Sequence, residues 1–204
     1  VQPVIPLSLN ADWNVVSRTI VPIVSQNEIF SGSGNQFGLS DTLQSLFLTP
    51  AQVGSMGIIW GLGPVFLLPT ATDKLLGRGQ WGAGPTGVVL KQSGPWTFGL
   101  LANHVWSFAG DTSRPGVSST FAQPFLSYTT DDAWTFTLNS ESSYDWIGRG
   151  WSVPANLMVS KVLDLGGQPI SIGEGGRYWL CSPDNGPTGF GARLFLTFLF
   201  PTGR

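Results

Sequence analysis

Hydrophobic and polar residues alternate along many segments of this chain of 204 residues. The clearest example is Trp134-Thr-Phe-Thr-Leu-Asn-Ser-Glu141, where apolar and polar residues take turns. The same period of two recurs in Trp96–Asn103 and in Ala192–Phe200. Because successive side chains of a strand point to opposite faces, this period predicts strands with one apolar and one polar face.

Turn-forming residues separate these segments and predict about eleven strands: 2–9, 14–26, 37–49, 56–69, 82–92, 96–108, 117–129, 133–145, 151–163, 169–181 and 188–200. The spacing predicts one antiparallel all-β domain over residues 1–204. Four prolines fall inside predicted strands, where each removes a backbone donor: Pro22, Pro64, Pro85 and Pro124. Glycines beside Pro64 and Pro85 predict bulges or bends there.

Composition indicates that much of the surface does not face water. Only 11% of the residues are charged, against roughly 25% in a typical soluble domain, and the chain has 9 Trp and 13 Phe. A spanning helix needs about 20 apolar residues in a row. The most apolar stretch, residues 57–69, contains three Gly and two Pro. A closed β-barrel is therefore the expected membrane-spanning structure.

The connections between the predicted strands alternate in length, as in outer-membrane barrels with short periplasmic turns and longer outer loops. Tryptophans lie beside both kinds of connection, which predicts two belts at the membrane interfaces: Trp13, Trp96 and Trp134 at the short turns, and Trp81, Trp106, Trp146, Trp151 and Trp179 at the long loops. Trp60 lies mid-strand and fits neither belt. We expect a protein of a Gram-negative outer membrane, in contact with phospholipid and lipopolysaccharide.

Single-chain bacterial barrels have an even number of strands, whereas the predicted strands number eleven. If the short turns are periplasmic, the first predicted strand begins on the outer side. We therefore expect an antiparallel transmembrane β-barrel of about 12 strands, with the N-terminal strand, about ten residues long, missing from this chain.

Several motifs resemble one family of outer-membrane barrels, described as transporters or as outer-membrane proteins of the phenol-degradation meta pathway. They are Gly38-Leu-Ser-Asp-Thr42, Leu68-Pro-Thr-Ala-Thr72, Trp81-Gly-Ala-Gly-Pro85, Asn103-His-Val-Trp106 and Gln123-Pro124. The resemblance covers essentially the whole chain. It implies an outer-membrane barrel with a transport role, and members of the family carry an earlier strand.

A charge facing lipid at mid-depth costs about 2–4 kcal/mol for Arg or Lys, so charged residues within strands should face the lumen. The predicted pore-lining residues are Arg18, Asp41, Lys91, Gln123, Asn139, Glu141, Glu174, Arg177 and Arg193. Glu174 and Arg177 have opposite parity, so both face inward only if Gly175-Gly176 forms a bulge. These charges predict either a selectivity lining or an ion-pair lattice that braces and closes the barrel.

Other chemistry has little support in the sequence. A twelve-stranded outer-membrane phospholipase fold uses a His–Ser pair, but His104 shares the parity of Trp96 and Trp106 and is expected in the aromatic belt. Catalysis would need a Ser within reach of His104 and a third, orienting group. One His, one Cys and no basic run favour neither a metal site nor a nucleic-acid surface, and no cofactor is expected.

The sequence therefore favours a passive outer-membrane channel or transporter for small molecules, and no enzyme. Aromatic or partly apolar solutes are implied only by the family resemblance. The alternative is a structural or interaction barrel, packed in an outer-membrane complex or array without transport. Paired charges across the lumen would favour the alternative, and an open polar path would favour transport.

Overall fold

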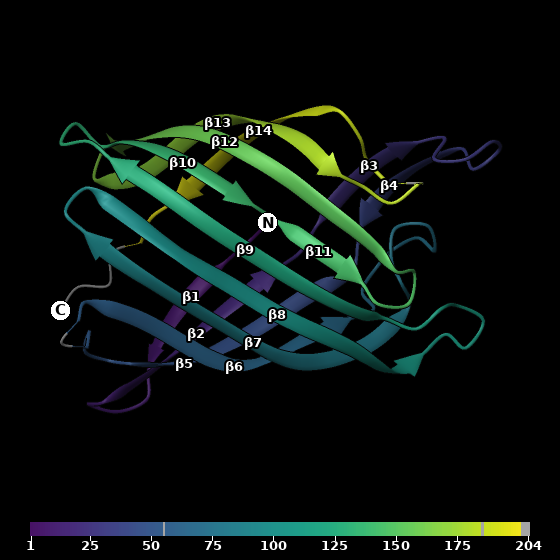
Figure 1. The fold of residues 1–204 in the computed structure, drawn as a ribbon, viewed down its shortest axis with the longest axis horizontal. Coiled ribbons are helices and arrows are strands. Elements are labelled where there is room, and N and C mark those ends of the chain that lie inside the picture. Colours follow the sequence, from purple (N-terminus) through teal and green to yellow (C-terminus); the bar gives the residue numbers. More distant parts are fainter. Residues whose placement is uncertain (55, 185, 201–204) are drawn as a thin grey trace. The chain divides into compact units, whose positions relative to one another are not determined.

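The computed structural model describes residues 1–54, 56–184 and 186–200. Its elements are strands: β1 (Val4–Ser8), β2 (Trp13–Ile20), β3 (Ile23–Asn27), β4 (Asn35–Leu39), β5 (Thr42–Pro50), β6 (Ile58–Leu68), β7 (Gln80–Ser93), β8 (Trp96–Gly110), β9 (Ser118–Thr129), β10 (Trp134–Ser140), β11 (Ser142–Asp145), β12 (Gly150–Leu165), β13 (Gln168–Cys181) and β14 (Phe190–Phe198) (Figure 1). Within the described residues, no helix is long and apolar enough to cross a membrane.

Twelve strands form one antiparallel sheet, in the order β1-β2-β5-β6-β7-β8-β9-β10-β12-β13-β14, with β11 beside β9 and β12. The remaining strands, β3 and β4, form a separate two-stranded sheet. The predicted all-β, antiparallel fold is confirmed. β10 and β11 together occupy the predicted segment 133–145. Each of the eleven predicted segments therefore supplies one of the eleven strands along the main path of the sheet. The expected earlier strand remains a prediction.

The structure differs from the predicted strands in two places. Segments 14–26 and 37–49 are each divided, and the outer parts pair as the β3–β4 hairpin, with Ile23 opposite Leu39. Pro22 lies in the gap between β2 and β3, where its missing N–H cannot continue the ladder. At Pro64 the register is the same on both sides, with Ser45 opposite Val65 and Leu48 opposite Leu62, so no bulge forms there.

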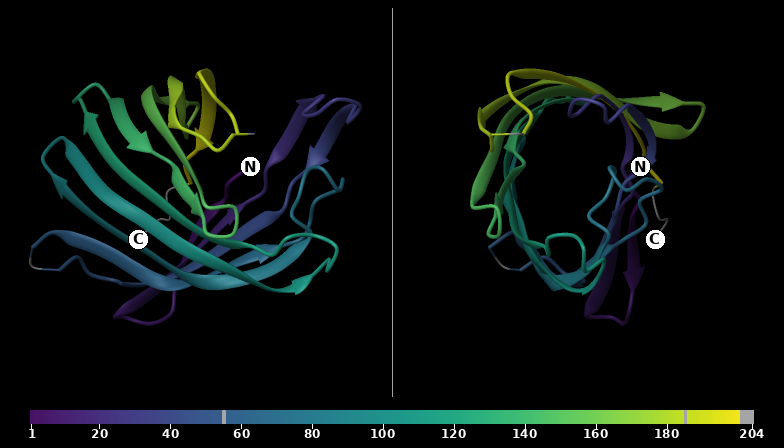
Figure 2. Two further views of the ribbon diagram at one scale, coloured as in Figure 1. Left: turned by 45° about the vertical axis from the view of Figure 1, so that its right-hand side comes forward. Right: turned by 90° about the vertical axis from the view of Figure 1, so that its right-hand side faces the viewer.

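The described chain falls into two compact units. Unit 1 comprises residues 1–89, 101–121 and 145–149, and unit 2 comprises residues 90–100, 122–144 and 150–204. β7, β8, β9 and β11 contribute residues to both units. Figure 2 shows the strands as long, curved ribbons, with the β3–β4 hairpin extending beyond β2 and β5. The single-domain expectation remains a prediction, and each unit is described separately below.

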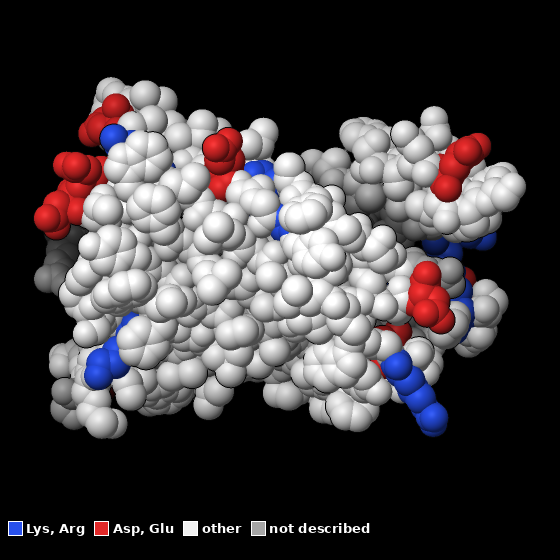
Figure 3. Space-filling model, turned by 45° about the horizontal axis from the view of Figure 1, so that its top comes forward, with Lys and Arg blue, Asp and Glu red and all other residues white. Residues whose placement is uncertain are grey.

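In unit 2, the ladders of β10, β12, β13 and β14 separate two faces. The apolar face carries exposed side chains: Phe136, Leu138, Leu157, Ile172, Leu194 and Leu196. Leu194 is 82% exposed and Leu157 is 66% exposed. The opposite, polar face carries Asn139, Asn156 and Arg177, which are aligned in the same ladders. Figure 3 shows a surface that is largely uncharged, with acidic and basic side chains mainly towards its margins.

In unit 1, the core lies on one face of β2, β5 and β6. Phe47, Val65 and Ser45 are buried on this face, with Val65 at 0% exposure. Leu48 and Leu62 pair on the other face and are 41% and 60% exposed. An exposed apolar face is therefore common to both units, as the alternating pattern predicts.

Two adjacent glycines of β13 are predicted to respond oppositely to alanine. A Cβ at Gly175 would lie 2.5 Å from the Leu157 carbonyl oxygen, whereas a Cβ at Gly176 meets nothing within 4 Å. Glycine within a strand costs roughly 0.5–1 kcal/mol relative to alanine. We expect Gly176→Ala to raise the urea midpoint of unfolding and Gly175→Ala to lower it, measured by heat-shifted gel mobility. Equal midpoints for the two variants would contradict the register of β12 and β13.

Candidate functional site

Five polar side chains form a continuous network on the polar face of unit 2. Asn156 Nδ2 donates to Asn139 Oδ1 at 2.7 Å, and Arg177 Nε donates to Asn156 Oδ1 at 2.5 Å. The Arg177 guanidinium also binds the Glu141 carboxylate through Nη2 and Oε2. Arg193 Nη1 donates to the second oxygen of Glu141 at 2.8 Å. We call these five residues the polar-face network.

The strand order explains why residues so distant in sequence meet. Glu141 lies between β10 and β11, and the guanidinium groups come from β13 and β14, with Asn156 of β12 in between. Side-chain exposure is 21% for Glu141, 24% for Arg177 and 40% for Arg193. Two guanidinium groups against one carboxylate leave one positive charge in excess within the network.

Asn156 is the member of the network that sequence reasoning missed. It is 1% exposed and uses its amide as donor to Asn139 and as acceptor from Arg177, so its burial leaves no polar atom unsatisfied. In the ladder Asn156 lies directly opposite Asn139 and Arg177. This alignment is visible only when the register of β10, β12 and β13 is known. The alternation of residues within one strand does not show which residues of its neighbours lie opposite.

Four of the predicted pore-lining residues, Asn139, Glu141, Arg177 and Arg193, are therefore brought together. Gln123 shares their face by alternation, because Phe125, two residues later, pairs with Asn139. Lys91 has the parity of Val89, which is 44% exposed, so the expectation that it faces the lumen is not supported. In unit 1, Arg18 pairs with Ser45 on the buried face.

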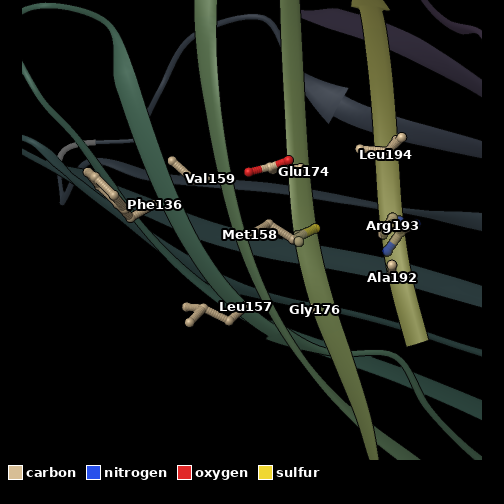
Figure 4. A pocket seen from close by; sticks show the side chains of 10 residues that line it. Phe136, Leu157, Met158, Val159, Glu174, Gly176, Ala192, Arg193 and Leu194 are labelled. Carbon is tan, nitrogen blue, oxygen red and sulfur yellow. The ribbon is translucent and has the colours of Figure 1, made fainter. Parts of the chain in front are cut away.

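Glu174 does not lie where the sequence placed it. The β12–β13 and β13–β14 ladders run without a shift past Gly175 and Gly176, so the expected bulge is wrong. Glu174 pairs with Val159 and with Leu194 on the apolar face, opposite to Arg177. Figure 4 shows its carboxylate on the same side as Val159, with Met158 pointing the other way.

Asp41 is buried at 8% exposure and lies between β4 and β5, not within a strand. Its carboxylate accepts hydrogen bonds from the backbone N–H of Ala71 at 3.3 Å and of Arg78 at 2.5 Å. Arg114 donates to the carbonyl oxygens of Gly77 at 2.8 Å and Lys74 at 2.6 Å in the same loop. We call residues 69–79 the 69–79 loop. Asp41 binds backbone N–H groups of this loop, and Arg114 binds its backbone carbonyl oxygens.

Threonines of the Leu68-Pro-Thr-Ala-Thr72 motif attach the start of this loop. Thr70 Oγ1 accepts from the Thr42 N–H at 2.9 Å, and Thr72 Oγ1 accepts from the Leu39 N–H at 3.0 Å. Gly38 leaves room for Thr72, because a Cβ at Gly38 would overlap the Thr72 hydroxyl. The two motifs that carry the family resemblance are therefore packed against each other.

The loop's arginine anchor has an acidic neighbour. Asp111 Oδ2 lies 3.4 Å from Arg114 Nε, outside the strands. The Ser113 hydroxyl and the Ser113 N–H donate to the Asp111 carboxylate at 2.6 Å and 3.0 Å. These hydrogen bonds, with a smaller effect of Arg114, hold the pKa of Asp111 below its usual value. Asp111 thus remains charged beside Arg114.

His104 has a serine within reach but lacks the geometry of a hydrolase. Ser118 Oγ is 3.4 Å from Nε2, and Thr120 Oγ1 is 2.7 Å from Nδ1. The Trp146 indole N–H also donates to Thr120 Oγ1, at 2.8 Å. The contact between Ser118 and Nε2 is long for a hydrogen bond. The orienting position is held by a hydroxyl and not by a carboxylate.

Six of the predicted belt tryptophans are exposed, between 41% and 56%: Trp81, Trp96, Trp106, Trp134, Trp146 and Trp151. Trp13 is half-buried against Trp60, with ring centroids 6.1 Å apart. Trp60 was expected in mid-strand, but it is the third residue of β6, close to the strand's start. The expectation that Trp179 belongs to the interface belt is wrong. It has the parity of Arg177, whose guanidinium lies 5.4 Å from the Trp179 ring, so it belongs to the polar face.

The comparisons with known proteins bear on the fold. No family model matches the chain, and no curated protein matches it. A solved structure does match, the crystal structure of the COG4313 outer membrane channel from Pseudomonas putida F1. The match has a TM-score of 0.71 and 16% identity, and covers 96% of this chain and 81% of that one. The fold is that of an outer-membrane channel barrel.

That fold agrees with the expectation from alternating strands and loop lengths. Groups of three or more His, Cys, Asp or Glu able to hold a metal ion do not occur in the described part of the chain. The polar-face network lies in unit 2, and the 69–79 loop with Asp41 and Arg114 lies in unit 1.

Proposed function

We propose that this chain spans a Gram-negative outer membrane and forms a passive channel for small molecules. The observation that carries the proposal is the separation of faces in unit 2, where exposed Leu157 and Leu194 lie on one face of the paired strands β12, β13 and β14, and Asn156 and Arg177 lie on the other. Lipid would cover the first face and water the second, as in other outer-membrane barrels. The matched structure is itself named an outer membrane channel, which supports the same function.

The polar-face network supports a preference for anions on this wall. Its excess positive charge is held by hydrogen bonds to Glu141 and Asn156, so the guanidinium groups are oriented before a solute arrives. Aromatic or partly apolar solutes, implied by the family resemblance, would fit this charge if they carry a carboxylate. Membership of the meta-pathway family is part of this proposal.

Planar-bilayer recording of the refolded protein tests the channel. We expect discrete, ohmic steps and a reversal potential that favours anions in a salt gradient. Arg193→Gln removes the excess charge, so the anion preference should fall, whereas Arg149→Gln, in an exposed turn, should leave it unchanged. An equal preference in wild type and Arg193→Gln would contradict a role for the network in selectivity.

The second candidate is a structural barrel without transport. The pairing of Glu141 with Arg177 and Arg193 favours it, because these bonds brace β10, β13 and β14. Silence from protein whose folding is verified by heat-shifted mobility would favour this role over an open channel.

A further inference from the structure

A cavity of about 510 Å³ lies on the apolar face of unit 2 (Figure 4). Phe136, Leu157 and Leu194 border it, and the small residues Gly176 and Ala192 leave its middle empty. A Cβ built on Gly176 would meet nothing within 4 Å, so the space above β13 is open. The volume falls within the roughly 300–1,000 Å³ typical of small-molecule sites.

One carboxylate, that of Glu174, belongs to this apolar cavity. The ladders place it between Val159 and Leu194, and its side chain is exposed. In the described residues, no hydrogen bond or ion pair neutralises it. Lys161 shares this face, opposite Ile172, but its ammonium lies over the Trp134 ring, 4.9 Å from the centroid. Arg193 also lines the cavity, but its guanidinium binds Glu141 on the polar face.

The position of Glu174 along its strand makes this isolation costly. Glu174 is the seventh residue of the 14-residue strand β13. At about 3.3 Å per residue it lies roughly 20 Å from either end of the strand. If the apolar face contacts lipid, as in the proposed function on which this step rests, a charge at that depth is unfavourable without a partner.

We propose that this cavity binds an amphiphilic cation, with an ammonium group against Glu174 and an alkyl or aryl body against Phe136, Leu157 and Leu194. The ammonium supplies the missing countercharge, and the body fills the space above Gly176. A lipid headgroup does not fit, because it stays at the membrane interface, whereas Glu174 is the seventh residue of the 14-residue strand. An anion would be repelled, and an uncharged molecule would leave the carboxylate unpaired.

Electron paramagnetic resonance of a chain-labelled alkylammonium tests the site. The protein is inserted into phosphatidylcholine vesicles, and the motionally restricted fraction of the labelled amine is compared with that of the equally long labelled fatty acid and alcohol. We expect the amine to be enriched about tenfold at the protein. Glu174→Gln should abolish the enrichment, since a charge-assisted hydrogen bond is lost.

Two further variants separate the cavity from its charge. Gly176→Leu fills the open space with the carboxylate intact and should also abolish the enrichment. Leu180→Phe, on the same face outside the cavity, and Asp132→Asn, in an exposed turn, should retain it. Enrichment that survives Glu174→Gln or Gly176→Leu would overturn the proposal, because the amine would then follow the general surface charge.

A second copy of the chain could supply the same ammonium chemistry through a lysine. If wild type is dimeric in detergent and Glu174→Gln is monomeric by light scattering, a copy and not a small amphiphile occupies the cavity, and the proposal is wrong. Protein that inserts and conducts without amine enrichment overturns this inference alone. Protein that fails to insert overturns the proposed function, and this inference with it.

Discussion

Replacing Glu141 by glutamine is expected to weaken the barrel and to change its ion selectivity together. The substitution leaves Arg177 and Arg193 side by side without a carboxylate, and only Asn156 still accepts from Arg177. Removing one partner of a fully buried pair costs about 3–5 kcal/mol. Because Arg193 is 40% exposed, water offsets part of this loss, and we expect about 1–2 kcal/mol.

The measurements are the urea midpoint of unfolding, followed by gel mobility, and the reversal potential in a salt gradient. The midpoint should fall, and the preference for anions should increase, because the excess charge rises from one to two. Glu28→Gln is the matched control, since Glu28 is exposed in the turn between β3 and β4. Neither value should change in that control.

A double variant identifies the cause. In the Glu141→Gln background, Arg193→Gln removes one of the two unpaired guanidinium groups, so part of the lost stability should return. Additive losses in the double variant would show that Glu141 stabilises the protein independently of Arg193. That outcome would contradict the network as described.

The fold could be predicted because its main signals are local. Alternation in segments such as 134–141 and 192–200 specifies strands and faces without knowledge of their neighbours. The division at Pro22 was missed because a proline's effect depends on whether its N–H would have had a partner in the ladder. At Pro64 the expected bulge is absent, and the register of β5 and β6 is the same on both sides of the proline. Its effect, too, could not be predicted without knowledge of the ladder.

The site was predicted less completely, because it depends on register between strands. The rule that charges within strands face inward selected Glu141, Arg177 and Arg193, with Asn139 beside them, and the structure brings these residues together. Parity put Glu174 opposite to Arg177, and the same rule led to a bulge that the ladders do not contain. The local pattern was the better guide there.

Asp41 shows a different limit. It was expected to line the pore, yet it is buried and binds the backbone of the 69–79 loop. The contacts join residues 30 and 37 positions apart, so no short motif reveals them. The resemblance to the barrel family marked both partners, in the Gly38–Thr42 and Leu68–Thr72 motifs, without indicating that they pack together.

Replacing Asp41 by alanine is expected to expose the 69–79 loop to trypsin at Lys74. Ala71 and Arg78 would each lose the acceptor of a backbone N–H in a partly buried hydrogen bond. An unsatisfied buried donor costs about 1–3 kcal/mol, so two partly buried donors together cost about 2 kcal/mol, which would raise the open population roughly thirtyfold. When opening is fast, the cleavage rate follows that population.

Arg114→Ala should act similarly, because it removes the donors to the carbonyl oxygens of Gly77 and Lys74. Asp41→Asn should be intermediate, since it keeps one acceptor oxygen but turns an N–H₂ group towards a backbone N–H. Asp12→Asn, in the turn before β2, is the control for loss of a carboxylate and should cleave at the wild-type rate. Equal rates for Asp41→Ala and this control would show that Asp41 does not hold the loop.

The same variant connects the loop to the channel proposal. If the 69–79 loop restricts the aqueous path, Asp41→Ala should raise the single-channel conductance or its noise. The recordings use the solution conditions in which trypsin cuts the loop of this variant. If cleavage accelerates while conductance stays the same, Asp41 and Arg114 are purely structural anchors. The selectivity of the channel would then depend on the polar-face network, whose charge the Glu141 and Arg193 variants change without touching the loop.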